Sequence, residues 1–253
     1  MIEIKNITVG YGKQPVLDSI GTSIEKGRLT SIIGVNGSGK STFLKAILGI
    51  LPLRNGSISI DGAELSSLKR NEIAQRVAYL SQGKSTPDMT VEQMVLHGRF
   101  PYLSYPRRYT EKDRKIAYSA MERVGICELA GKPLHTLSGG MRQNAYIAMA
   151  LAQDTDYILL DEPTTYLDIA HQLELMRILR ALADSGKGIV TVMHDLPLAF
   201  DFSDEIVLMA NKTSLIKASP AEMCKSPVIQ ELFGVQIKKM AEEEERYYYT
   251  MRR

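Results

Sequence analysis

A short glycine-rich stretch near the N-terminus constrains the fold most strongly. Residues 34–42 read Gly-Val-Asn-Gly-Ser-Gly-Lys-Ser-Thr, with two glycines, a lysine and a hydroxyl residue at the spacing of a phosphate-binding loop. The β-branched run at residues 29–33 predicts a buried strand, and residues 43–48 carry apolar side chains at helical spacing. Because this loop motif functions between a strand and a helix, the stretch predicts an α/β fold.

The residue types of this loop suit a phosphate group. Its glycines allow successive backbone N–H groups to converge on one anion, and the helix N-terminus adds a partial positive charge. Lys40 can reach the β- and γ-phosphates, and the Ser41 hydroxyl can bind Mg²⁺. The alternative, a glycine-rich turn with a lysine nearby, explains neither the strand nor the helix. By itself the loop predicts only a nucleoside triphosphate ligand.

Composition is that of an ordinary globular chain. The 253 residues suffice for one large α/β domain or two small ones, and 44% are hydrophobic. A net charge of +2 gives no indication of a nucleic-acid partner, and the two cysteines predict neither a disulfide framework nor a zinc site. No signal segment opens the chain, and no apolar run approaches the roughly 20 residues that cross a bilayer. Any role at a membrane is therefore expected to be exerted through a partner.

Two carboxylates follow a predicted strand at residues 156–160. Near a bound triphosphate, Asp161 can hold Mg²⁺ and Glu162 can orient or polarise water. The alternative is a solvated strand end. The phosphate loop in the same chain favours the catalytic interpretation.

Two more polar residues follow predicted strands, and ligands bind beyond the carboxyl ends of strands in α/β sheets. Gln82 follows the strand at residues 76–80, and His194, which could hydrogen-bond a terminal phosphate, follows the strand at 188–193. A solvated loop glutamine and a structural histidine remain the alternatives. Tyr11, in a turn between two glycines, either stacks on an adenine base or packs on its neighbours.

Residues 89–152 form a predicted helical insert. It contains an amphipathic helix at 111–124 and ends in Leu137-Ser138-Gly139-Gly140, followed by an apolar helix at 143–151. Ser138 and the two glycines are a second anion-receptive helix N-terminus, or alternatively a serine cap preceded by a loop.

Three further predictions concern the connecting and C-terminal segments. Residues 63–75 and 220–233 are each predicted to be one helix. Residues 234–237 and 246–251 are predicted to pair as a small hairpin around the acidic run at 242–245.

Taken together, these residues resemble an ATP-binding-cassette (ABC) ATPase subunit. Five elements occur in the family's order: the phosphate loop, Gln82, the Leu137–Gly140 signature, the Asp161–Glu162 pair and His194. The signature separates this family from GTPases and nucleoside kinases. The resemblance covers residues 1–233 and leaves 234–253 as a C-terminal tail. It implies a phosphate-loop (RecA-like) α/β core with an N-terminal antiparallel β subdomain and a helical signature subdomain.

The resemblance also implies a head-to-tail dimer that encloses two ATP molecules with Mg²⁺. Within one subunit the nucleotide would contact residues of the base and phosphate sites: Tyr11, Val16, Gly34, Asn36, Gly37, Ser38, Gly39, Lys40, Ser41 and Thr42. The metal would be held by Ser41, Gln82 and Asp161.

The catalytic roles implied by the resemblance fall to a few residues. Glu162 would act as general base, and His194 and Gln82 would contact the γ-phosphate and the metal. Across the interface, Ser138, Gly139 and Gly140 would reach the other subunit's ATP, and Asp168 would lie at the dimer seam.

The chain departs from the family pattern at three positions. Met141 stands where glutamine usually continues the signature, and Asn144 replaces a common basic residue. Tyr166 is bulky where the seam loop usually has a smaller or polar residue. The phosphate-contacting residues are intact, so activity is expected to survive.

A second motif points to the kind of transporter. His97-Gly98-Arg99-Phe100-Pro101-Tyr102, followed by Thr110-Glu111-Lys112-Asp113, resembles subunits that energise import of iron-siderophore complexes, haem or vitamin B12. The alternative is an ordinary helix break. Iron-siderophore import is the expectation, with haem and vitamin B12 as alternatives.

The expected partners are a second copy of the chain, transmembrane permease subunits and, indirectly, a substrate-binding protein, with no nucleic acid. The expected location is the cytoplasmic face of the membrane. A soluble cassette acting on ribosomes or DNA usually has two cassettes or a long inserted coiled coil. A small-molecule kinase has no use for the signature serine.

Overall fold

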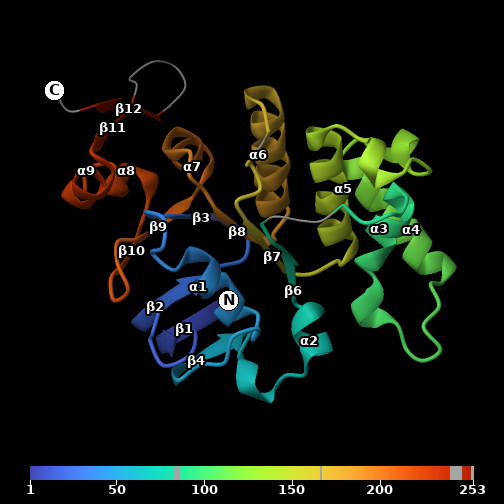
Figure 1. Cartoon of the computed structure of the whole chain (residues 1–253), viewed down its shortest axis with the longest axis horizontal. Helices are drawn as coiled ribbons and strands as arrows, with labels where there is room; N and C mark the ends of the chain where they lie inside the picture. The colour runs from blue at the N-terminus through green and yellow to red at the C-terminus, as the bar shows by residue number, and fades with distance from the viewer. Residues whose placement is uncertain (83–85, 166, 240–246, 252–253) are drawn as a thin grey trace.

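The computed structural model describes residues 1–82, 86–165, 167–239 and 247–251, arranged around two sheets and a lateral group of helices (Figure 1). The strands are β1 (Ile2–Val9), β2 (Leu17–Ile24), β3 (Leu29–Ile33), β4 (Asn55–Ile60), β5 (Ala63–Glu64), β6 (Val77–Leu80), β7 (Tyr157–Asp161), β8 (Gly188–Val192), β9 (Glu205–Met209), β10 (Leu215–Ala218), β11 (Val235–Lys239) and β12 (Tyr247–Met251). The α-helices are α1 (Lys40–Ile47), α2 (Arg70–Ala74), α3 (Val91–His97), α4 (Glu111–Arg123), α5 (Gly139–Ala152), α6 (Ile169–Asp184), α7 (Leu196–Phe202), α8 (Pro220–Met223) and α9 (Pro227–Phe233).

The central sheet has the order β10-β9-β3-β8-β7-β6. Its five strands from β9 to β6 run parallel, and β10 joins the edge antiparallel to β9. Every residue of β3, β7 and β8 is buried, as expected for parallel strands covered on both faces. The carboxyl ends of β3, β6, β7 and β8 therefore meet at one edge, and the polar residues that follow them are brought together.

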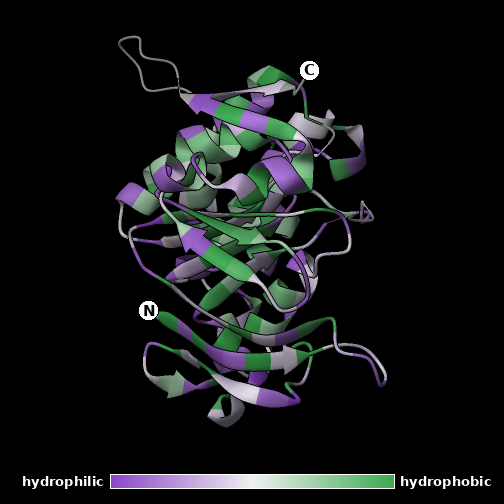
Figure 2. Cartoon of the chain, turned by 90° about the vertical axis from the view of Figure 1, so that its left-hand side faces the viewer, coloured by the Kyte–Doolittle hydropathy of each residue, from purple (hydrophilic) through white to green (hydrophobic). Residues whose placement is uncertain are grey.

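A second, antiparallel sheet has the order β2-β1-β4-β5. Ile2, Ile4 and Ile7 of β1 are buried in the same cluster as Phe43 and Leu44 of α1, which lies between the two sheets (Figure 1). Apolar residues run through the strands in the middle of the molecule, and polar residues increase toward its outer loops (Figure 2). The phosphate-loop helix is thus held in apolar packing between the two sheets.

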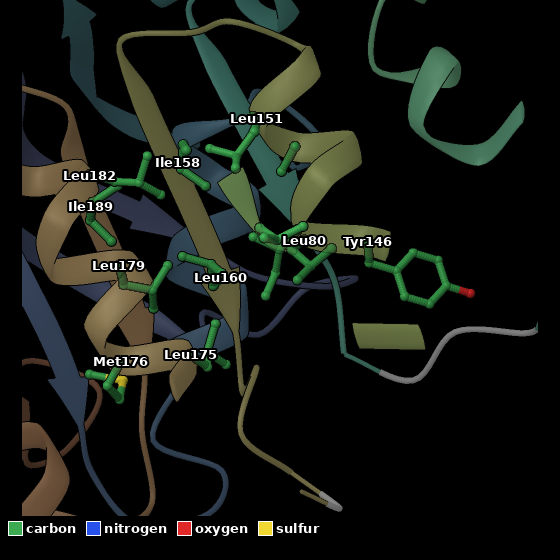
Figure 3. Packing of buried hydrophobic residues seen from close by; sticks show 14 of the residues in the cluster. Leu80, Tyr146, Leu151, Ile158, Leu160, Leu175, Met176, Leu179, Leu182 and Ile189 are labelled. Atoms are coloured by element: carbon green, nitrogen blue, oxygen red, sulfur yellow. The ribbon is translucent and has the colours of Figure 1, made fainter. Parts of the chain in front are cut away.

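The other face of the central sheet is covered by helices. Leu175 and Leu179 of α6 belong to one buried cluster with Ile158 and Leu160 of β7, and Figure 3 shows these side chains directed toward one another. The same cluster continues into α3, α4 and α5, which lie to one side (Figure 1). Within the described ranges, none of the helices combines the length and apolarity that a membrane crossing requires.

Two predicted helices were wrong. Residues 63–75 hold the short strand β5, a 3₁₀ turn (Leu65–Ser67) and α2, because Ala63 and Glu64 pair with β4 instead of continuing a helix. Residues 220–233 form two helices, α8 and α9. The break lies at Ser226, which caps α9 ahead of Pro227; proline has no N–H to continue the preceding helix.

One helix boundary and one strand also differ from expectation. Helix α5 begins at Gly139, four residues before the predicted start, because Ser138 caps it. Strand β10 was not predicted; its four residues are half-buried and pair with β9.

The C-terminal segment forms a two-stranded antiparallel sheet of β11 and β12. Tyr247 anchors it on α7: its ring centroid lies 5.4 Å from that of Phe200, and its backbone N–H donates to Asp201 Oδ1 at 2.7 Å. The acidic run at 242–245 and the departure at Tyr166 lie outside the described residues.

Candidate functional site

The phosphate loop connects β3 to α1 with two closely packed glycines. Gly39 has φ 101°, and a Cβ there would lie 2.5 Å from Leu17 Cδ2 and 3.3 Å from Val16 Cγ1. A Cβ on Gly34 would lie 2.5 Å from the Met209 carbonyl oxygen. Side chains at these positions would force the loop away from the strands, so both glycines are sterically required.

Lys40 lies folded over the loop. Its side chain is buried, and Nζ donates to the carbonyl oxygens of Gly34 at 2.8 Å and Val35 at 3.0 Å. Burial lowers the pKa of the Lys40 ammonium, while the nearby carboxylates of Glu162 and Asp161 oppose that effect. The ammonium group is held at the position where phosphate oxygens would meet the loop.

The loop fits an anionic ligand by two further observations. Ser38 Oγ is buried and finds no hydrogen-bond partner among the described residues, which is unusual because buried hydroxyl groups are normally paired. A cavity of about 220 Å³ opens over the loop. Its lining residues are Val16, Asn36, Gly37, Gly39, Lys40, Ser41, Thr42 and Glu162.

Asp161 closes the floor of the site at the end of β7. Its Oδ1 accepts from Ser41 Oγ at 3.1 Å and its Oδ2 from Tyr79 OH at 3.3 Å. Burial raises the pKa of the Asp161 carboxyl, and the hydrogen bonds from Ser41 and Tyr79 counteract the rise. A serine hydroxyl beside a carboxylate is a donor set that suits Mg²⁺.

Glu162 brings the two other predicted catalytic residues together. Its Oε1 lies 2.7 Å from His194 Nε2, and its Oε2 accepts from Gln82 Nε2 at 2.5 Å. The backbone of Glu162 has φ 52°, a left-handed conformation that non-glycine residues rarely adopt and that concentrates at functional sites. This turn directs the carboxylate away from the strand and toward the loops after β6 and β8.

Tyr11 occupies the rim. Its side chain is 53% exposed, and its hydroxyl lies 3.5 Å from Lys45 Nζ at the outer side of α1. The exposed ring leaves room for a stacked base, whereas close packing on neighbours would have buried it.

The signature segment caps a different helix. Ser138 is the N-cap of α5, and its Oγ accepts from the Met141 backbone N–H at 3.3 Å. Among the described residues, the lining of the phosphate-loop cavity includes none from the signature. Gln143 connects α5 to the loop after β7 by donating to the Pro163 carbonyl oxygen at 3.0 Å. Asp168 caps α6 nearby.

A groove of about 280 Å³ separates the signature helix from the Gln82 side of the site. It is lined by the segment after β6, the first turns of α5 and the loop after β7: Leu80, Ser81, Gln82, Gly139, Arg142, Gln143, Tyr146, Asp161, Glu162, Pro163, Thr165 and Leu167. The described part of the chain therefore has a groove between Gln82 and the helical insert.

Sequence reasoning missed two residues of the site. Tyr79 of β6 contacts the buried Asp161. The only sequence feature that could have marked Tyr79 is its position three residues before Gln82. His171 lies between Asp168 and the signature helix, and no motif marked it.

The Gly-Arg-aromatic-Pro motif has a structural role. The Arg99 Nε donates to Asp113 Oδ1 at 3.0 Å, and Arg99 Nη1 donates to the Ala152 carbonyl oxygen at 2.9 Å. Asp113 also closes the capping box of α4 with Thr110. Both charged side chains are less than a tenth exposed. The motif therefore ties α4 to the end of α5.

Comparisons with known proteins agree with this geometry. The family model for ABC transporters matches residues 17–165. The chain is 40% identical over 237 residues to the petrobactin import ATP-binding protein FpuD of Bacillus anthracis, covering 93% of this chain and 87% of that protein. It is 37% identical over 236 residues to the iron(3+)-hydroxamate import ATP-binding protein FhuC of Bacillus subtilis, covering 92% and 88%.

Solved structures give the same result. An inward-facing metal-chelate type ABC transporter matches with a TM-score of 0.85 and 25% identity, covering 99% of this chain and 98% of that one. The dimeric bacterial ABC transporter cassette MJ0796 matches with a TM-score of 0.75 and 28% identity, covering 87% and 99%. The fold, the assembled site and these matches lead to one conclusion: the chain belongs to the ABC transporter family.

Proposed function

We propose that this chain is the ATP-hydrolysing subunit of an ABC importer and works as a head-to-tail dimer. The observation that carries the proposal is a connected set of residues at the phosphate-loop cavity. Lys40, Ser41 and Glu162 line the cavity, Asp161 accepts from Ser41, and Gln82 and His194 both contact Glu162. Phosphoryl transfer to water depends on positioning and on charge neutralisation. Lys40 and the Ser41–Asp161 pair would serve charge neutralisation, and the Gln82–Glu162–His194 group would position the attacking water and the γ-phosphate.

Within this site the residues divide the work. The loop amides, Ser38 and Lys40 bind the phosphates, and Tyr11 offers its ring to the adenine. Ser41, Asp161 and Gln82 are the side chains that would hold Mg²⁺, which supplies charge neutralisation at the β- and γ-phosphates. Glu162 accepts a proton from the attacking water, and His194 contacts the γ-phosphate.

The position of the signature supports the proposed dimer. Ser138, Gly139 and Gly140 form a helix N-terminus, where phosphate groups bind favourably, yet they are absent from the described lining of their own chain's cavity. A second copy related by two-fold symmetry can place its signature over that cavity, and two equivalent sites then form at once. The matched cassette MJ0796 is a dimer.

The importer role and cargo rest on the relatives. Two of them are import ATP-binding proteins, one for petrobactin and one for iron(3+)-hydroxamate, and a matched structure is a metal-chelate type transporter. We propose an iron-siderophore complex as cargo, with haem and vitamin B12 importers as alternatives. The groove beside Gln82 is the proposed docking site for a cytoplasmic helix of the permease, and the proposed location is the cytoplasmic face of the membrane.

The substitution Glu162→Gln tests the mechanism. Without the carboxylate, release of free phosphate from ATP should nearly cease, while ATP binding persists. The subunit should then accumulate as a dimer, which light scattering would detect. Glu231→Gln, at an exposed glutamate of α9, is the matched control and should behave as wild type.

Normal phosphate release by Glu162→Gln would remove Glu162 from its role. Transfer of phosphate to a metabolite by the wild-type protein would favour a kinase. Co-purification with ribosomes in place of a membrane permease would favour the soluble class of cassette.

A further inference from the structure

His171 lies between two parts of the site with different proposed roles, the dimer seam at Asp168 and the signature turn at Gly140. It is the third residue of α6, and its imidazole lies between Asp168, the N-cap of that helix, and Gly140 in the first turn of α5. Asp168 is assigned to the dimer seam, and Gly140 to the turn that reaches the partner's ATP. The imidazole is the side chain that touches both.

The contact with Gly140 is tight. A Cβ on Gly140 would lie 2.7 Å from His171 Nε2 and 2.9 Å from His171 Cγ, closer than real Cβ contacts allow. Gly140 does not have a positive φ, so the backbone itself would accept an L-residue. A Cβ at this signature position would therefore have to displace the imidazole, whereas the backbone conformation would accept it.

The contact with Asp168 fixes the ring. Asp168 Oδ1 accepts from the His171 backbone N–H at 2.9 Å and lies 2.8 Å from His171 Nδ1. These two bonds also hold the pKa of the Asp168 carboxyl below its usual value. With Nδ1 bound to the carboxylate, the opposite edge of the ring is held against Gly140.

We propose that His171 is a positioning residue that links Asp168 at the dimer seam to the signature turn, Ser138–Gly140, within one subunit. When a partner subunit contacts Asp168 and displaces it, the imidazole moves with Asp168 and shifts Gly140. The position of Ser138 relative to the partner's ATP then changes. This inference rests on the head-to-tail dimer proposed above. It adds a residue that acts on dimer closure without touching nucleotide.

One experiment tests the contact between the His171 imidazole and Gly140 by thermal unfolding of the nucleotide-free monomer. Gly140→Ala should lower Tm in the wild-type chain, because its Cβ overlaps the imidazole. In a His171→Ala background the same substitution should cause little further loss. An equal loss in both backgrounds would overturn the contact.

A second experiment tests the link, using Glu162→Gln as the background in which ATP traps the dimer. Two half-variants separate the contacts: His171→Asn keeps a donor for Asp168 without the ring, and His171→Phe keeps a ring on Gly140 without the donor. Each of these variants, like His171→Ala, should raise the ATP concentration for half-maximal dimerisation about tenfold. This is the size expected for losing a coupling between contacting residues. ATP binding to the monomer should not change.

The outcomes separate the two proposals. If Glu162→Gln alone does not dimerise with ATP, the head-to-tail dimer is wrong. If it dimerises and either half-variant matches it, one contact suffices and His171 is not a link. If His171→Ala fails to fold, the two half-variants decide the question by the same measurement.

Discussion

Removing one partner of the buried ion pair between Arg99 and Asp113 should strongly destabilise the helical subdomain. Arg99→Met leaves the Asp113 carboxylate buried, and removing one partner of such a pair costs about 3–5 kcal/mol. Asp113 keeps its bonds from the Thr110 backbone and hydroxyl at 2.9 and 2.7 Å, so we expect the lower end, about 3 kcal/mol.

Asp113→Ala should cost more than Arg99→Met. It leaves the guanidinium with the Ala152 carbonyl oxygen and the face of Tyr102, 4.0 Å away, and it also breaks the α4 capping box, which adds about 1 kcal/mol. The double variant Arg99→Met with Asp113→Ala should cost far less than the sum of the two, because no uncompensated charge remains.

Thermal unfolding measures these effects. For a chain of this size, about 3 kcal/mol corresponds to a fall in Tm of roughly 6–12 °C. Arg114→Met is the matched control: its pair with Glu92 on α3 is about half exposed and should contribute less than about 1 kcal/mol. Additive losses in the double variant, or equal losses for Arg99→Met and Arg114→Met, would refute the reasoning.

Three further predictions concern the site and its support. Lys40→Ala should lose nucleotide affinity in a titration with a fluorescent ATP analogue, and unchanged binding would contradict the assignment of the loop. Tyr79→Phe removes one of two hydrogen bonds to Asp161, so the Mg²⁺ concentration for half-maximal ATPase activity should rise up to about tenfold, at a cost near 1 kcal/mol; an unchanged midpoint would exclude that role. Burial would raise the pKa of Asp61, but bonds from the N-terminal ammonium, Lys26 and Tyr157 lower it to about 2. Because the folded-state pKa is depressed, Asp61→Asn should cost about 2 kcal/mol in urea unfolding at neutral pH, and the difference from wild type should vanish as pH falls from about 4 to 2.

The grouping of Gln82, Glu162 and His194 was predictable because these residues follow strands. Gln82, Glu162 and His194 lie far apart in the sequence, but each comes just after a parallel strand, and parallel strands end at one edge. Glu162 hydrogen-bonds or pairs with the other two. The central strands β3, β7 and β8 were predictable because they are rich in aliphatic and β-branched residues and buried along their whole length, as a sheet covered on both faces requires.

The missed features depend on contacts between elements. Residues 63–75 have the composition of a helix, but pairing of Ala63 with Ile60 of β4 overrides local preference. His171 could not be found from the sequence because its role depends on a spatial contact with Gly140, which lies 31 positions earlier in the chain. Arg99 stood out only as part of a subfamily motif, whereas its buried pairing with Asp113 gives that motif a physical cause.

The folded-back Lys40 has a consequence for ligand choice. An arriving nucleotide must compete with two of the chain's own carbonyl oxygens for one ammonium group. A monophosphate offers Lys40 few anionic oxygens in place of these two carbonyl oxygens. A triphosphate offers more, because its β- and γ-phosphates can also reach the ammonium group. We therefore expect ATP to displace Lys40 from the carbonyl oxygens of Gly34 and Val35, and AMP to leave both hydrogen bonds in place.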